Sequence, residues 1–204
     1  SVATCGVNSP GTGASRRRTA RGRTVGGVRE DVVRRGVPDA LRSGNPTVFF
    51  VHRSLLMTTV GSARYPGDEY VLPFGRAREV RSGEDITVVT WGAMTHRCVE
   101  AADRFAGRVD LLDLRTVAPW DRDAVLTSVR RTGRCLVVHE DSLTAGFGAE
   151  IAATVAREAF WMLDAPVERL AVEDVPVPYH SVLLEAVLPS VDQIAERLSS
   201  LLDV

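Results

Sequence analysis

The sequence contains no lysine, and all 25 of its basic residues are arginine. We interpret this as a bias of the genome, but it leaves no phosphate-binding loop of the GxxxxGK[ST] type, and no GDG-type metal-binding loop is present either. Cysteine is also scarce: Cys5, Cys98 and Cys135 are widely spaced and do not follow the spacing of zinc ligands. We expect three free thiols, which are typical of the reducing cytoplasm.

Long apolar runs are absent as well. No stretch reaches the ~20 consecutive apolar residues that a membrane-spanning helix needs, and the N-terminal residues lack the apolar region of a signal peptide. We therefore predict a cytoplasmic protein that does not interact with membranes. Its 204 residues, of which 45% are hydrophobic, suit one domain of ordinary size with an additional segment, or two small domains.

The charges are unevenly distributed along the chain. Residues 1–45 hold nine arginines against three acidic residues, whereas residues 46–204 hold sixteen arginines against twenty-three acidic residues. A basic arm can bind nucleic acid, but residues 1–40 contain no aromatic side chain for stacking and no helical periodicity. We therefore interpret residues 1–40 as a disordered or misread segment rather than a nucleic-acid-binding arm, and we expect no nucleic-acid partner.

Short apolar runs of the kind found in buried strands alternate with amphipathic helical patterns in the rest of the chain. Strands are expected at residues 77–81, 86–91, 109–114, 135–138 and 166–172. Helices are expected from about residue 93, from residue 121 to 133, through the stripe at 151–163, and after residue 190. This alternation predicts an α/β fold with a parallel sheet covered on both faces.

The residues that begin and end two of these helices can be assigned in advance. Asp121 is an expected N-cap, and Gly133 is expected to end the same helix in the left-handed conformation. Ser190 and Gln193 have the spacing of a capping box for the last helix.

Polar residues follow the strand at 135–138, where ligands bind in α/β proteins. His139, Glu140 and Asp141 could perform acid–base chemistry, but neighbours in a strand point to opposite faces, so His139 and Glu140 cannot act on one proton. We prefer an anchoring role for the loop and predict no catalytic residue. His52, His96 and His180 have no partner at ligand spacing and are expected to be surface or loop residues.

Gly146 and Gly148 precede the helical stripe at 151–163. Free backbone N–H groups there could bind an anion, but only two of the glycines of a dinucleotide-binding motif are present. Tight packing of the helix on the sheet is the better supported interpretation.

Four motifs, in one order, resemble the β subunit of the 2-oxo acid dehydrogenases, which are thiamine-diphosphate-dependent decarboxylating components of large acyl-transferring complexes. They are VVHEDSLTAGFGAEIAATVAREAF at 137–160, DLRTVAPWD at 113–121, LDAP at 163–166 and DVPVPY at 174–179. The resemblance covers roughly Leu41 to the C-terminus. It implies a three-layer α/β/α transketolase C-terminal fold at 72–204, whose mostly parallel sheet has one antiparallel strand. Residues 41–71 would be the remnant of a preceding pyrimidine-binding domain plus a linker, and Val48–Val51 an apolar strand with no partner sheet.

The resemblance also implies cofactors and partners. In the family, thiamine diphosphate and Mg²⁺ bind between the α subunit and the pyrimidine domain of the β subunit, which carries the catalytic residues. We therefore expect no catalytic, cofactor-binding or metal-binding residue in this chain. The implied partners are the α subunit, a second β subunit and the small, basic subunit-binding domain of the dihydrolipoyl acyltransferase. Asp164 and the terminal carboxylate of Val204 would face that domain, although Asp164 equally suits a turn before Ala165 and Pro166.

The sequence thus indicates the C-terminal portion of a 2-oxo acid dehydrogenase β subunit, which contributes to assembly and to docking on the acyltransferase core, and which is not expected to be active alone. Pro119-Trp120-Asp121 slightly favours a branched-chain substrate. One alternative is a non-catalytic binding or assembly module. Another is a transketolase-like enzyme such as deoxyxylulose-phosphate synthase, against which the motifs at 163–166 and 174–179 argue.

Overall fold

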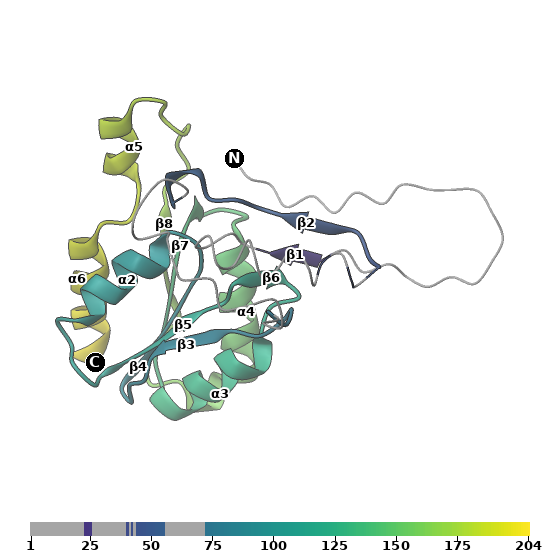
Figure 1. Cartoon of the computed structure of the whole chain (residues 1–204). Helices are drawn as coiled ribbons and strands as arrows, with labels where there is room; N and C mark the ends of the chain where they lie inside the picture. Colours follow the sequence, from purple (N-terminus) through teal and green to yellow (C-terminus); the bar gives the residue numbers. More distant parts are fainter. Residues whose placement is uncertain (1–22, 26–39, 41, 43, 56–71) are drawn as a thin grey trace.

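The main sheet has five strands in the order β3-β5-β4-β7-β8 (Figure 1). The computed structural model describes residues 23–25, 40, 42, 44–55 and 72–204. The strands of this sheet are β3 (Arg78–Arg81), β4 (Ile86–Thr90), β5 (Val109–Asp113), β7 (Cys135–Ser142) and β8 (Glu168–Val172). Strand β3 runs antiparallel to β5, and all the other pairs are parallel. This arrangement confirms the predicted α/β fold with one antiparallel strand.

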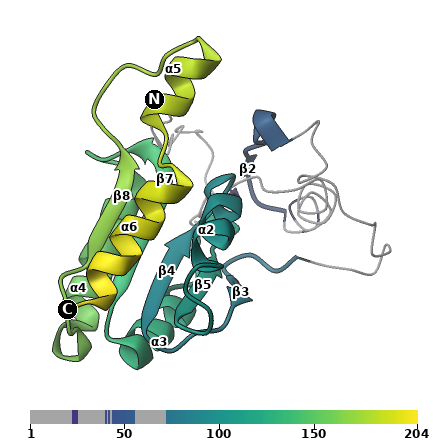
Figure 2. The ribbon, with the colours of Figure 1, turned by 90° about the vertical axis from the view of Figure 1, so that its left-hand side faces the viewer.

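Helices cover both faces of this sheet (Figure 2). On one face lie α2 (Met94–Ala102) and α6 (Val191–Leu202), and on the other lie α3 (Arg122–Thr132) and α4 (Phe147–Glu158). Successive side chains of a strand point to opposite faces, so Val88 packs in the core beneath α2 and α6 while its neighbour Val89 packs in the core beneath α3 and α4. The two cores make the three layers that the resemblance implied.

Local capping interactions hold the helix ends as predicted. The Asp121 carboxylate accepts a hydrogen bond of 3.2 Å from the backbone N–H of Ala124. Gly133 ends α3 with a φ of 70°, a conformation that glycine adopts without a Cβ clash. At the start of α6, the Ser190 hydroxyl accepts from the N–H of Gln193 at 3.1 Å, and the Gln193 side chain accepts from the N–H of Ser190 at 2.9 Å.

A second, three-stranded sheet lies beside the main one. Its strands are in the order β2-β1-β6, where β1 is Arg23–Val25, β2 is Thr47–Phe49 and β6 is Thr116–Ala118. Two expectations change here. The strand near Val48 does have a partner, because β2 pairs in parallel with β1, and three residues of the segment at 1–40 form a strand rather than being disordered. Residues 1–22 and 26–39 of that segment lie outside the described residues.

The region after α4 also differs from expectation. The helix stops at Glu158, and a short 3₁₀ helix, η3 (Phe160–Met162), follows it instead of a continuous stripe to Leu163. Phe160 is 59% exposed, whereas Ala159 is buried. Leu163 is in the extended conformation, since it leads into Asp164 and the strand beyond.

The segment between β8 and α6 extends away from the domain. It contains α5 (Ser181–Val187), a helix with no buried residue that the sequence did not predict and that projects beyond the sheet (Figures 1 and 2). Within the described part of the chain, no helix combines the length and the apolar character needed to cross a membrane.

Candidate functional site

The carboxyl ends of β4 and β7 lie next to each other, at the edge where α/β proteins bind ligands. His139, near the end of β7, is fully buried and stacks on Trp91, with 5.2 Å between ring centroids and 9° between ring planes. Burial lowers the pKa of His139 to about 4, so the ring is neutral at pH 7. Neither ring nitrogen has a hydrogen-bond partner among the described residues, so His139 here is a packing residue of the core.

Two glycines let α4 begin directly against this ring. A Cβ on Gly148 would collide with Nε2 and Cδ2 of His139, and a Cβ on Gly146 would lie 2.9 Å from its Cε1 and collide with the carbonyl of Ser142. No side chain fits in either place. The pair therefore serves the close packing of helix on sheet that was predicted for it.

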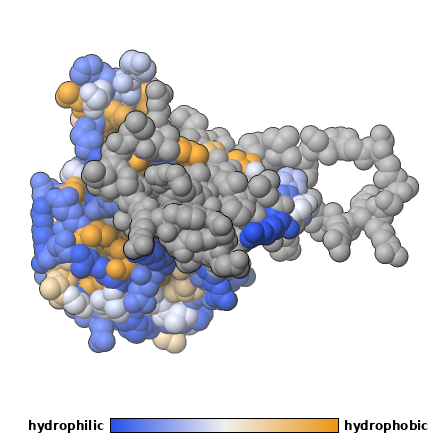
Figure 3. Space-filling model, in the orientation of Figure 1, coloured by the Kyte–Doolittle hydropathy of each residue, from blue (hydrophilic) through white to orange (hydrophobic). Residues whose placement is uncertain are grey.

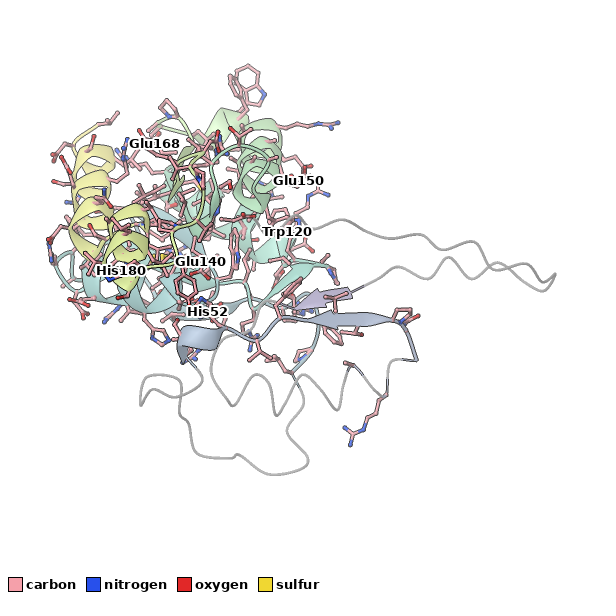
Figure 4. The ribbon with its side chains drawn as sticks, turned by 90° about the horizontal axis from the view of Figure 1, so that it is seen from above. His52, Trp120, Glu140, Glu150, Glu168 and His180 are labelled. Atoms are coloured by element: carbon pink, nitrogen blue, oxygen red, sulfur yellow. The ribbon has the colours of Figure 1, made fainter. Side chains whose placement is uncertain are left out.

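Glu140 lies on the opposite side of β7, as predicted for neighbours in a strand. Its Oε1 is 2.7 Å from Nε2 of His52, and Figure 4 shows the two side chains directed toward each other. The other nitrogen of the same ring, Nδ1, is 2.8 Å from the hydroxyl of Ser54, which belongs to the short helix η1 (Arg53–Leu55). The hydrogen bond to Glu140 raises the pKa of His52, while burial acts in the opposite direction.

His52 lies in a loop, as expected for a surface or loop histidine, but it is half-buried and hydrogen-bonded to Glu140, which the sequence did not indicate. Its partner Glu140 is 88 residues away in the sequence, so no local pattern could indicate the pair. His180 also has a structural role: its Nδ1 accepts a hydrogen bond of 3.3 Å from the N–H of Val182 and caps α5. His96 is half-buried on α2.

The start of α2 lies beside the His52–Glu140 pair. Gly92 precedes this helix with a φ of 69°, and a Cβ at that position would lie 3.5 Å from Oε1 of Glu140 and 3.8 Å from Cδ2 of His52. The chain reversal that begins α2 is thus in contact with both side chains. A glycine between a strand and a helix was the only sequence signal for this contact.

Asp164 combines a backbone role with an exposed carboxylate. Its N–H donates a hydrogen bond of 2.8 Å to the carbonyl of Gly133, which fixes the turn after α3. Its side chain is 65% exposed, and its Oδ2 is 3.9 Å from Nη1 of Arg134, which is too long for a hydrogen bond. Val204, at the end of the chain, is 73% exposed.

Besides Val48, Phe50 and Val51 at and after β2, two segments of the described surface expose large apolar side chains. One is η3 with Phe160, Trp161 and Met162. The other, which we call the arm, is the segment 175–183 that leads into α5, and its exposed members are Val175, Val177, Tyr179, Val182 and Leu183. Figure 3 shows apolar surface over α5. Such contiguous patches mark interaction surfaces more often than isolated apolar residues do.

The sequence of this domain matches the family described as "Transketolase, C-terminal domain" over residues 75–194. The chain belongs to this family. Within the transketolase C-terminal family, its domain is of the type found in 2-oxo acid dehydrogenase β subunits, as the following relatives show.

The chain is 43% identical over 143 residues to the mitochondrial 2-oxoisovalerate dehydrogenase subunit beta 2 of Arabidopsis thaliana, covering 68% of this chain and 39% of the relative. It is 39% identical over 159 residues to the acetoin:2,6-dichlorophenolindophenol oxidoreductase subunit beta of Cupriavidus necator, covering 76% and 46%. It is 37% identical over 167 residues to the pyruvate dehydrogenase E1 component subunit beta of Porphyra purpurea, covering 80% and 50%. The chain therefore spans half or less of the length of these relatives.

A solved structure shares the fold. It is described as "Split gene transketolase, inactive beta4 tetramer", and it superposes with a TM-score of 0.70 at 21% sequence identity, covering 90% of this chain and 58% of that one. At this identity the likeness concerns the fold alone.

Complete enzymes of this transketolase-related group depend on thiamine diphosphate, but the described residues do not fit that cofactor or its Mg²⁺ ion. No group of three or more His, Cys, Asp or Glu side chains in this part of the chain could hold a metal ion. The hollow beside α5 is lined by Ser181, Val182, Glu185 and Ala186, which include no basic group for a diphosphate. His139, the buried polar residue at the ligand-binding edge, is enclosed by Trp91 and the start of α4.

Proposed function

We propose that this chain is the C-terminal part of a 2-oxo acid dehydrogenase β subunit and that its task is assembly: contact with other subunits and docking on the acyltransferase core. The observation that carries the proposal is a domain of the β-subunit type whose surface exposes the arm and η3. Contiguous exposed apolar side chains stabilise a protein when a partner covers them. The partners are the α subunit and a second β subunit.

The arm is the part of the surface best suited to a subunit contact. Helix α5 buries none of its own residues, and a helix this short gains little stability in water without packing. Its described link to the domain is Arg97 of α2, which donates to the Pro189 carbonyl at 2.8 Å and to the Glu185 carboxylate at 2.5 Å. A partner that covers Val182 and Leu183 would supply the apolar packing that the domain itself does not.

Docking on the acyltransferase is proposed for Asp164 and the carboxylate of Val204. Both are exposed, and residues 46–204 carry seven more acidic than basic residues. A small, basic subunit-binding domain, which the resemblance implies as the partner, would be attracted to such a surface. The enzyme of which this chain would be a part acts in the cytoplasm, with a branched-chain 2-oxo acid slightly preferred because of Pro119-Trp120-Asp121.

Decarboxylation is not assigned to this chain, because its described residues do not fit thiamine diphosphate. The proposal is tested by mixing the purified chain with the acyltransferase subunit-binding domain and measuring binding by titration calorimetry. A one-to-one or two-to-one complex supports it. The absence of binding at high micromolar concentration, in a chain whose circular dichroism shows the folded α/β domain, would contradict it.

A further inference from the structure

Three side chains at the ligand-binding edge form a continuous hydrogen-bonded line. The hydroxyl of Ser54 is 2.8 Å from Nδ1 of His52, and Nε2 of His52 is 2.7 Å from Oε1 of Glu140. An ionised carboxylate only accepts hydrogen bonds, so Nε2 carries the hydrogen that it donates to Glu140. Nδ1 is then unprotonated in the neutral ring and accepts the hydrogen of the Ser54 hydroxyl.

This order of groups is the one that nucleophilic catalysis needs. A hydroxyl is a weak nucleophile until an adjacent base takes its proton, and the base works best when a third group fixes its tautomer and orientation. Ser54 supplies the hydroxyl, His52 the base and Glu140 the orienting carboxylate. In the common serine-hydrolase triad Nε2 faces the serine and Nδ1 faces the carboxylate, whereas here Nδ1 faces Ser54 and Nε2 faces Glu140. In both arrangements the nitrogen that faces the carboxylate carries the hydrogen and the nitrogen that faces the serine is free to accept one.

Ser54 is more exposed than His52 and Glu140, as a nucleophile that substrate must reach requires. Ser54 is exposed, whereas the side chains of His52 and Glu140 are 21% and 31% exposed. An ester can therefore reach the hydroxyl, while partial shielding strengthens the hydrogen bond that orients the ring. Gly92, which precedes α2, lies beside both shielded residues: a Cβ built on it would be 3.5 Å from Oε1 of Glu140 and 3.8 Å from Cδ2 of His52.

We propose that Ser54, His52 and Glu140 form a hydrolytic site for small acyl esters, with Ser54 as the nucleophile, His52 as the general base and Glu140 as a positioning residue. This activity is separate from assembly and does not depend on the proposed function. The local alternative is that the same contacts only fix the segment after β2 to the domain.

The reaction balances with water as the second reactant. His52 Nδ1 takes the proton of the Ser54 hydroxyl while Oγ bonds to the ester carbonyl carbon. The bond from that carbon to the alcohol oxygen then breaks, and the alcohol leaves with the proton from Nδ1. Water next attacks the acyl-serine, again giving its proton to Nδ1, and the bond to Oγ breaks. The carboxylic acid leaves, and Ser54 regains its proton from His52.

The first test uses the full chain with p-nitrophenyl acetate and a fluorophosphonate. We expect Ser54→Ala to lower the protein-dependent rate about 100-fold, at the lower end of what general-base catalysis contributes. Ser200→Ala, an exposed serine on α6, is the matched control and should leave the rate unchanged. Peptide mass spectrometry should place the phosphonyl group on Ser54. A full rate in Ser54→Ala, or an adduct that avoids Ser54, would overturn the proposal.

The second test separates catalysis from a structural role. The rate requires neutral His52, so it should rise with pH through the pKa of His52, which Glu140 raises; Glu140 is the charged group acting on His52 among the described residues. Glu140→Gln removes that effect and allows the opposite tautomer, so we expect a lower maximum rate and a midpoint at lower pH. If the midpoint of the pH–rate profile is the same in Glu140→Gln and wild type, or if Ser54 is phosphonylated equally in His52→Gln and wild type, the contacts among these three residues have only a structural role.

Discussion

Gly148 lies directly against the imidazole of His139, so closely that a Cβ on the glycine would collide with Nε2. The same ring is fully buried and stacked on Trp91, which limits its freedom to move away. The first turn of α4, the end of β7 and the end of β4 are therefore held together by one buried aromatic contact.

This contact predicts the effect of Gly148→Ala. Alanine improves helix propensity by up to about 1 kcal/mol over glycine, but overpacking in a closed core destabilises by roughly 1–3 kcal/mol. Because the collision is with a buried ring that also stacks on Trp91, we expect the second effect to win and the free energy of unfolding to fall by about 2 kcal/mol. Urea denaturation measures it. Ala153→Ser, at an exposed position on the same helix, should change stability by less than about 0.5 kcal/mol.

Local signals explain why much of the fold could be predicted. Asp121, Gly133 and the Ser190–Gln193 pair act on backbone groups within four residues, so their identity and spacing were sufficient. Apolar periodicity likewise predicted the five strands of the main sheet, since each must bury one or both faces, whereas β1 and β6 of the small sheet were not predicted. The candidate site could not be predicted in the same way, because His52 and Glu140 meet only after the chain has folded. Strand β1 could not be predicted either, because it pairs with its neighbours through backbone hydrogen bonds that do not depend on side-chain identity.

The Asp110 carboxylate predicts a pH-dependent stability. It is buried on β5, where it accepts hydrogen bonds from Ser128 and Arg131. Burial raises the pKa of Asp110 above its usual value, and the nearby charge of Glu79 adds to this effect. The interactions with Ser128 and Arg131 lower the pKa but do not cancel the effect of burial. The folded state then binds more protons than the unfolded state between the two pKa values, so this group's contribution to stability falls as the pH rises through that interval.

The comparison that isolates this effect is Asp110→Asn. The difference in unfolding free energy between wild type and variant should favour the wild type most below the usual pKa of aspartate and should shrink as the pH rises. Denaturation at a series of pH values from acid to neutral measures it. A difference that grows with pH would mean that the ion pair with Arg131 outweighs burial.

The arm predicts a test of subunit contact. Leu183 is 57% exposed on α5, so Leu183→Ser should reduce self-association of the chain, or its association with the α subunit, without lowering the melting temperature. Sedimentation velocity over a range of concentrations measures the effect. Ala156→Ser, at an exposed position on α4 outside both the arm and η3, is the control for a non-specific change in surface polarity. Equal association in both variants would place the contact elsewhere.

The side chains of the described residues predict that the chain alone does not bind thiamine diphosphate. No described residue cluster could hold Mg²⁺, and the hollow beside α5 contains no basic group. Titration calorimetry of the chain with thiamine diphosphate and Mg²⁺ should therefore show no heat beyond dilution, and no 2-oxo acid should be decarboxylated. Micromolar affinity would show that the cofactor site had been wrongly excluded.

Asp164 predicts how docking depends on charge. Its carboxylate is exposed, and its ion pair with Arg134 is long at 3.9 Å, so a basic side chain of the subunit-binding domain could approach it without breaking a hydrogen bond to Arg134. Asp164→Asn should weaken binding by roughly 1–3 kcal/mol, the range for a hydrogen bond to a charged group. The fold should be unaffected, because the hydrogen bond that fixes the turn comes from the backbone N–H of Asp164, which asparagine retains.

Salt dependence decides whether this loss is electrostatic. Higher ionic strength should weaken the wild type more than Asp164→Asn, because screening acts on the charge that the variant lacks. The dissociation constants for the subunit-binding domain at two salt concentrations measure both effects. Glu100→Gln, which removes an exposed charge on α2 outside the proposed docking residues, is the matched control for a change in net charge. If Asp164→Asn and wild type bind equally and share one salt slope, then Asp164 contributes to the turn between α4 and β8 and not to docking.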